Sequence, residues 1–180
     1  ILFALGRTSG PKFLDKVLGI YAWIFRGTPL LLQLFFFYYG LTIFGISLPP
    51  FGAAALTFII NYAAYMMEIF RSGIQSIDKG QYEAARALNM SYWQTMWRII
   101  LPQALKRTLP PSANEAITLV KDTALVVVIG MGELLRSAKE IFTRDFTITP
   151  FVIAAIFYLL LTSVVINVFR TLEKKLEVYD

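Results

Sequence analysis

The stretch FGAAALTFIINYAAYMMEIF, from Phe51 to Phe70, is apolar over twenty residues and carries a single charged side chain, Glu68. A helix needs about 20 mainly apolar residues to cross the hydrocarbon core of a bilayer. The run closes at Arg71, a cation of the kind that marks the cytoplasmic end of a span. This stretch predicts a transmembrane helix and sets the fold class of the whole chain.

The composition supports the same class. Hydrophobic residues make up 57% of the 180 residues and charged residues 16%, whereas an ordinary soluble domain has about 25% charged residues. The apolar runs do not alternate with polar residues, which excludes a β-barrel. We therefore expect an all-α, polytopic membrane protein.

The basic residues and the missing residue types exclude several functions. The net charge of +5 comes from Lys and Arg in segments that flank the apolar runs, so it indicates orientation in the membrane and not nucleic acid binding. The chain has no Cys and no His, which removes disulfides, thiol chemistry and the commonest metal ligand. No metal site is expected.

Hydropathy divides the chain into apolar windows and charged segments within one transmembrane domain, residues 1–180. Basic residues dominate 6–27, 72–112 and the end of the chain, which places these segments and the C-terminus in the cytoplasm. Residues 136–149 are expected to form a mixed-charge loop on the far side. The predicted spans are 1–5 (the remnant of a truncated first span), 29–46, 51–71, 113–135 and 151–170.

The segment 72–112 contains a predicted helix–turn–helix in the cytoplasm. Gln81–Leu88 consists of good helix formers. Asn89 tolerates the left-handed conformation that ends a helix, and Ser91 can cap a second, amphipathic helix over Tyr92–Ile100. Pro102 is expected to bend or break the chain.

The spacing of residues in this loop resembles a known signature. Glu83-Ala84-Ala85, then Asn89, then Ile99 and Leu101-Pro102 are similar to the cytoplasmic motif of permease subunits of ABC importers, in which a Gly stands at the place of Asn89. The polar amino acid uptake branch of that family is indicated by three further motifs: Arg26-Gly27-Thr28-Pro29-Leu30 with Gln33, Lys121-Asp122-Thr123, and Gly132-Glu133-Leu134. The resemblance covers essentially the whole chain.

The resemblance implies a type I importer fold with about five core spans per subunit and a cytoplasmic coupling helix–turn–helix. It also implies these partners: a cytoplasmic ABC ATPase dimer, a second permease subunit (identical or different), an extracytoplasmic amino acid binding protein, and the lipid bilayer of a prokaryotic plasma (inner) membrane. The chain itself has no Gly-rich phosphate loop ending in Lys-Ser or Lys-Thr. We therefore expect no cofactor in this chain and no enzymatic activity of its own, with ATP and Mg bound by the partner ATPase.

The coupling loop supplies the expected contacts with the ATPase. Glu83 would accept hydrogen bonds or salt bridges from the partner, the alanines and Leu88 would pack against it, and Trp93 would complete the rim. Gln81 and Arg86 fit a solvated face equally well. The predicted contact residues are Gln81, Glu83, Ala84, Ala85, Arg86, Ala87, Leu88, Asn89, Met90 and Tyr92.

Polar side chains within the predicted spans are candidate substrate contacts, because ionisable groups inside a membrane are costly and mark function. They form two stripes at helical spacing, one on each of two consecutive spans. The first stripe is Asn61, Tyr65 and Glu68, and the second is Glu115, Thr118 and Asp122. A free amino acid needs an acceptor for its ammonium, for which Glu68 or Asp122 would serve, and a donor for its carboxylate, such as Asn61, Thr123 or backbone N–H groups at a broken helix. The two acidic residues favour a cationic amino acid. The predicted substrate-binding residues are Asn61, Tyr65, Glu68, Thr118, Asp122 and Thr123.

Other interpretations of these residues remain open. Glu68 could reach the interface or pair with Arg71. Lys121 and Asp122 could form a structural ion pair with neighbouring spans, and Glu115 could act on the dipole at the start of its helix. A self-sufficient secondary transporter or channel would use Glu68 and Asp122 as ion or proton sites. Such folds usually contain internal repeats, and none is evident in this sequence.

Overall fold

In the computed structural model, which describes residues 1–177, the chain is built from helices and their connections, and the described part contains no strand. This confirms the predicted all-α class. The α-helices are α1 (Leu2–Ser9), α2 (Lys12–Gly27), α3 (Leu30–Tyr38), α4 (Pro50–Gln75), α5 (Lys79–Ala87), α6 (Tyr92–Thr95), α7 (Leu101–Asp122), α8 (Leu134–Asp145) and α9 (Thr149–Glu177). Two 3₁₀ segments, η1 (Gly40–Phe44) and η3 (Thr123–Ile129), and one π-helical turn, η2 (Met96–Ile100), complete the described structure.

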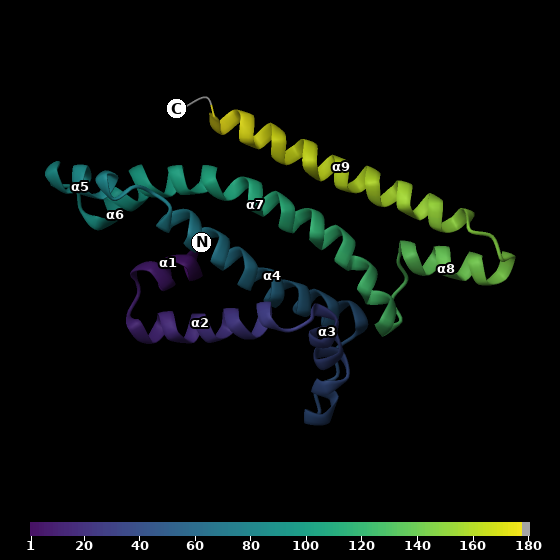
Figure 1. The fold of residues 1–180 in the computed structure, drawn as a ribbon. Coiled ribbons are helices and arrows are strands. Elements are labelled where there is room, and N and C mark those ends of the chain that lie inside the picture. The colour runs from purple at the N-terminus through teal and green to yellow at the C-terminus, as the bar shows by residue number, and fades with distance from the viewer. Residues whose placement is uncertain (178–180) are drawn as a thin grey trace.

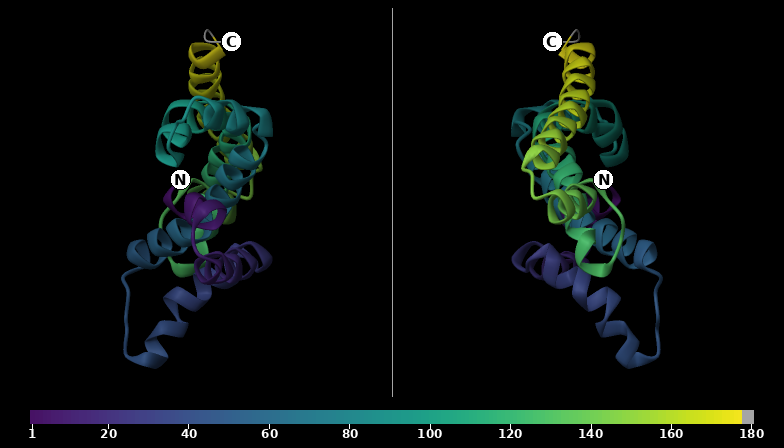
Figure 2. Two further views of the ribbon diagram at one scale, coloured as in Figure 1. Left: turned by 90° about the vertical axis from the view of Figure 1, so that its left-hand side faces the viewer. Right: turned by 90° about the vertical axis from the view of Figure 1, so that its right-hand side faces the viewer.

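The long helices are stacked side by side. Helix α2 packs on α4, α4 on α7, and α7 on α9, in the order that Figure 1 shows from bottom to top. Helix α3 and η1 project from this stack, as Figure 2 shows from two further sides. At the crossing of α4 and α7, a Cβ atom on Gly73 would overlap the methyl group of Thr108. Only glycine therefore allows the two helices to approach so closely at this point.

Among the described residues, two helices, α4 and α9, are long and apolar enough to cross a membrane on their own. The predicted span 29–46 differs from the structure, because α3 ends at Tyr38 and is joined to α2 as a broken pair bent by 102°. The break follows from Pro29, since a proline disfavours helical geometry in the residue before it, and Thr28 is extended at φ −118° and ψ 147°. Much of the segment 6–27, expected as a cytoplasmic connection, is the first half of this broken pair.

The helix that contains the start of the predicted span 113–135 begins well before residue 113. Helix α7 already begins at Leu101 and continues past Pro110 and Pro111 to Asp122, where it tightens into η3. Each proline removes a hydrogen bond from a helix interior, but α7 is packed against α4 on one side and α9 on the other, which holds it helical. Pro102 lies in the first turn of α7, where a missing N–H has no cost, so it does not break the chain.

Short helices form both in the connection before α9 and near the N-terminus. The expected loop 136–149 contains most of helix α8. The Glu133 side chain accepts hydrogen bonds from the first N–H groups of this helix. The last predicted span, 151–170, lies within α9. Residues 2–9 form α1, whose Ala4 and Leu5 are buried. That residues 1–5 are the remnant of a longer span remains a prediction.

Candidate functional site

A cavity of about 470 Å³ opens where the α2–α3 break meets α4 and α7. It combines two carboxylates, one guanidinium, two phenol groups and exposed backbone. Its wall is formed by Arg26, Gly27, Thr28, Pro29, Leu30, Asn61, Tyr62, Tyr65, Glu115, Thr118 and Asp122. A hollow of the same volume along α8 contains none of the predicted site residues. The cavity at the break is therefore the candidate substrate site.

Two buried amides hold the break in shape. Gln33 Nε2 donates to the carbonyl of Phe25 at 2.9 Å and to Thr28 Oγ1 at 2.8 Å, and Asn61 Nδ2 donates to the carbonyl of Phe25 at 2.8 Å and to Gln33 Oε1 at 3.0 Å. Backbone carbonyls at a helix end need such partners when they are buried. Asn61 lines the cavity as predicted, but both its amide hydrogens are already engaged. The predicted donation from Asn61 to a substrate carboxylate therefore does not fit the structure.

Arg26, at the end of α2, is the cation of the cavity, and the sequence did not single it out as a site residue. Its guanidinium lies 5.3 Å from the centre of the Tyr65 ring and 3.7 Å from Glu68 Oε2. Within residues 1–177 this guanidinium donates no hydrogen bond, and the side chain is 42% exposed. A guanidinium carries five N–H donors, so Arg26 offers unused donors at the cavity wall. The sequence signal that could have identified Arg26 as a site residue is its position directly before Gly27-Thr28-Pro29, where the helix breaks.

Both cavity carboxylates lie on α7. Asp122 accepts a hydrogen bond from the Tyr62 hydroxyl at 2.7 Å. Within the described chain neither Asp122 nor Lys121 forms an ion pair with another span. Glu115 lies deep in α7, not at its start, so the interpretation as a residue acting on the helix N-terminal dipole is wrong. Thr118 lines the cavity, whereas Thr123 is outside its wall and donates to the carbonyl of Val120.

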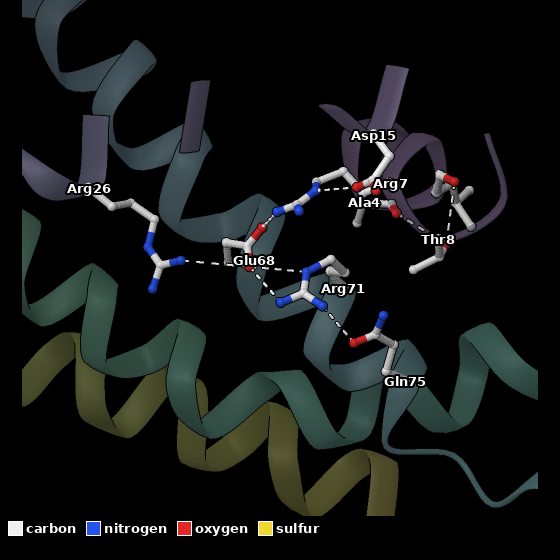
Figure 3. A network of polar contacts seen from close by, with 9 residues as sticks. Ala4, Arg7, Thr8, Asp15, Arg26, Glu68, Arg71 and Gln75 are labelled. Atoms are coloured by element: carbon white, nitrogen blue, oxygen red, sulfur yellow. Dashed lines mark hydrogen bonds and ion pairs between the residues drawn. The ribbon is translucent and has the colours of Figure 1, made fainter. Parts of the chain in front are cut away.

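Glu68 is the centre of a charge cluster beside the cavity, shown in Figure 3. Arg71 donates to Glu68 Oε2 from Nε at 3.0 Å and from Nη2 at 2.7 Å, and Arg7 donates to Oε1. Arg7 also donates to Asp15 at 3.0 Å. The Glu68 side chain is only 12% exposed and does not form part of the cavity wall. Of the open interpretations, pairing with Arg71 is therefore the one observed.

Polar caps define the coupling helix–turn–helix. Helix α5 begins at Asp78, whose side chain accepts from Gly80 N at 2.7 Å. Asn89 adopts φ 54°, the left-handed conformation predicted for it. Ser91 and Gln94 form a reciprocal capping box at the start of α6. The second helix is less regular than predicted, because it changes to a π-helical turn from Met96 onward.

One face of this element is anchored to the rest of the chain. Ile100 and Leu101 are buried in one cluster with Ala4 and Leu5 of α1, and Tyr82 of α5 packs against this cluster. Ala85, on the same helix as Tyr82, is fully buried. The prediction that Ala85 packs against the ATPase is therefore wrong, since its side chain is fully buried within the chain itself. Burial raises the pKa of the neighbouring Tyr82 hydroxyl, with a further contribution from Tyr92.

The opposite face is free and apolar. Leu88 is 74% exposed, and Trp93 and Trp97 are exposed by more than half. Large exposed apolar patches rimmed by polar residues mark sites of contact with another protein or with a membrane. Most of the predicted ATPase-contact residues are exposed in the structure, with Met90 half-buried: Gln81, Glu83, Ala84, Arg86, Ala87, Leu88, Asn89 and Tyr92.

The family of binding-protein-dependent transport system inner membrane components matches residues 1–178. The chain is 40% identical to the arginine transport system permease protein ArtQ of Bacillus subtilis (strain 168), over 100% of this chain and 83% of that protein. It is 38% identical to the glutamine transport system permease protein GlnP of Escherichia coli (strain K12), over 99% of this chain and 83% of that protein. The chain is also 38% identical to the L-cystine transport system permease protein TcyB of Bacillus subtilis (strain 168), over 99% of this chain and 77% of that protein.

Two solved structures share the fold. A crystal structure of an amino acid ABC transporter with histidines matches with a TM-score of 0.88 at 39% identity, covering 97% of this chain and 82% of that chain. An inward-facing structure of the MetNI methionine ABC transporter matches with a TM-score of 0.79 at 20% identity, with the same coverage. At that identity the second likeness concerns the fold alone.

Proposed function

The chain belongs to the family of binding-protein-dependent transport system inner membrane components, and on this premise we propose that it forms the path of a polar amino acid, with a cationic amino acid as its preferred substrate. Its relatives confirm the resemblance to ABC importer permeases that the loop motif indicated. They do not favour a self-sufficient secondary transporter, and Glu68, one of the two ion sites that such a transporter would need, is already held in ion pairs.

The charge balance of the cavity is the observation that carries the proposal. Arg26 supplies one positive group, and Glu115 and Asp122 supply two negative groups. A free amino acid with a cationic side chain has one carboxylate and two cations, which is the complementary set. Buried charges need partners of this kind, since an unpaired charge in a low-dielectric site is costly. A neutral amino acid would leave one cavity carboxylate unpaired.

Each end of such a substrate has a partner in the cavity. The planar guanidinium of Arg26 fits a carboxylate with two parallel hydrogen bonds. Glu115 and Asp122 accept from the ammonium group and from the side-chain cation. Asn61 contributes by holding the helix break through its bonds to Phe25 and Gln33 and not by donating to the substrate.

The coupling element connects this cavity to a source of energy. The exposed face with Leu88 and Trp93 provides an apolar surface that a cytoplasmic ATPase dimer would cover, and Glu83 provides a charged contact at its edge. Helix α4 leads from the cavity to this element through a short turn after Gln75. Movement of the ATPases, which bind ATP and Mg, would tilt the spans and expose the cavity to each side of the inner membrane in turn. A second permease subunit and an extracytoplasmic binding protein complete the importer, with the C-terminus in the cytoplasm.

Uptake by a reconstituted importer tests this proposal. The full-length permease, its ATPase and its binding protein are placed in proteoliposomes, and uptake of labelled arginine, lysine, glutamine and glutamate is measured with and without ATP inside. The proposal predicts ATP-dependent uptake of arginine or lysine well above that of glutamate. Uptake restricted to glutamine or glutamate would contradict the cationic substrate, and uptake driven by a proton gradient without the ATPase would contradict the importer.

A further inference from the structure

The carboxylate of Glu68 is shared unequally among three arginines. Arg71 makes two hydrogen bonds to Oε2, at 3.0 and 2.7 Å, and Arg7 makes one to Oε1. Arg26 also approaches Oε2, but at 3.7 Å and without a hydrogen bond. The oxygen nearest to Arg26 is thus already occupied by Arg71, and Arg26 is the most weakly held member of the cluster.

Arg26 is also the only one of the three arginines that lines the cavity. Its guanidinium lies over the Tyr65 ring and approaches Glu68, and Figure 3 shows this approach to Glu68. An anion that enters the cavity therefore meets a cation that Glu68 already attracts. If Arg26 turns to that anion, Glu68 keeps its hydrogen bonds to Arg7 and Arg71, so no buried charge is left without a partner.

We propose that Glu68 is a positioning residue that competes with the substrate carboxylate for Arg26 and so weakens the hold of the cavity on its substrate; this inference rests on the proposed function. A permease must release what it binds, and sites on a transport path require binding weak enough to allow exit. Glu68 supplies this weakness by drawing Arg26 away from the cavity. Because Glu68 lies on α4, the exchange of Arg26 also loosens the tie between α2 and the helix that leads to the coupling element.

Equilibrium binding to the permease–ATPase complex tests the proposal. The full-length complex is placed in nanodiscs without binding protein or nucleotide, and the dissociation constants of L-arginine and of L-arginine amide are measured. The amide lacks the carboxylate that Arg26 would bind. Glu68→Gln should keep an acceptor for Arg71 but lose the charge that attracts Arg26. We expect it to bind L-arginine about two- to fivefold more tightly, as removal of a partly exposed ion pair allows, and to bind the amide as the wild type does.

A matched control lies in the same cluster. Asp15→Asn removes a carboxylate that pairs with Arg7 at 3.0 Å and belongs to no part of the cavity wall. It should leave the binding of both ligands unchanged. Glu68→Asp serves if Glu68→Gln does not fold, because it keeps the charge but withdraws it by one methylene. It should tighten L-arginine binding by about two- to threefold.

The outcomes separate the two proposals. If the wild type binds L-arginine but Glu68→Gln weakens both ligands alike, or changes neither, Glu68 has a structural role only and the inference is overturned. If Asp15→Asn tightens L-arginine as much as Glu68→Gln does, the effect comes from the net charge of the cluster and not from competition for Arg26. If the wild type binds neither ligand and imports no amino acid, the proposed function itself fails.

Discussion

Truncation of Ile100 tests how the coupling element is attached to the membrane helices. Its side chain is fully buried in a cluster with Leu5 of α1, Ile74 of α4 and Met96. Ile100→Ala removes three carbon atoms, which costs about 2.4 kcal/mol at about 0.8 kcal/mol for each. The cavity left behind raises this to about 3–4 kcal/mol.

For a chain of this length, such a loss lowers the thermal midpoint by about 8–12 °C. The assay is the fraction of full-length, detergent-solubilised permease that remains monodisperse after heating, followed by size-exclusion chromatography. Leu88→Ala is the matched control, because its side chain is 74% exposed and lies in the same element. It should shift the midpoint by about 2 °C or less, while it reduces retention of the ATPase on immobilised permease.

The two variants are thus expected to separate anchoring from docking. A midpoint for Ile100→Ala within 2 °C of the wild type would refute the account of the buried cluster. Equal losses of stability in Ile100→Ala and Leu88→Ala would show that the element does not have one anchored face and one free face.

Three further substitutions test single features. Gly73→Ala should lower the thermal midpoint through a clash worth about 1–3 kcal/mol with Thr108, and Thr108→Ser in the same chain should restore part of it; an unchanged midpoint would contradict the close crossing. Asn61→Ala should lower the free energy of unfolding by about 1–3 kcal/mol, because it leaves Gln33 Oε1 without its donor. Amino acid uptake should fall together with stability. A stable variant with full uptake would mean that the helix break does not need the hydrogen bonds of Asn61. Ser91→Ala should cost about 1 kcal/mol through loss of the capping box, seen as faster proteolysis of the coupling element in the purified permease, and unchanged digestion would argue against it.

Local signals in the sequence were sufficient where a residue acts on its own neighbours. Asn89 ends α5 in the left-handed conformation, and Ser91 caps α6, because both effects depend only on adjacent backbone. The apolar run around Phe51–Phe70 identified α4 for the same reason, since length and hydropathy decide whether a helix can span a bilayer.

Features that depend on packing between helices were not predictable in this way. Helix α7 persists through Pro110 and Pro111 because α4 and α9 hold it on both sides. Ala85 was expected to face a partner, but its side chain is fully buried, and Tyr82 on the same helix packs against the cluster that contains Ala4 and Leu5 of α1. A local sequence pattern does not predict which face of a short helix the rest of the chain will cover.

The cavity likewise combines residues that local spacing predicts with residues that only the packing of helices brings together. Glu115, Thr118 and Asp122 share a face of α7, as their spacing indicated. Arg26 joins them only because the chain turns by 102° directly after α2. Glu68 has the spacing of a cavity residue, yet three arginines from separate parts of the chain hold it in the neighbouring cluster.

We propose that an amino acid binds between Arg26 and the carboxylates of α7. An experimental structure of the full-length permease with its ATPase, prepared with L-arginine, tests it most directly. We expect ligand density in the cavity at the α2–α3 break, with the α-carboxylate on Arg26 and the cationic groups toward Glu115 and Asp122. Ligand density elsewhere in the membrane, with this cavity empty and Arg26 still beside Glu68, would contradict it.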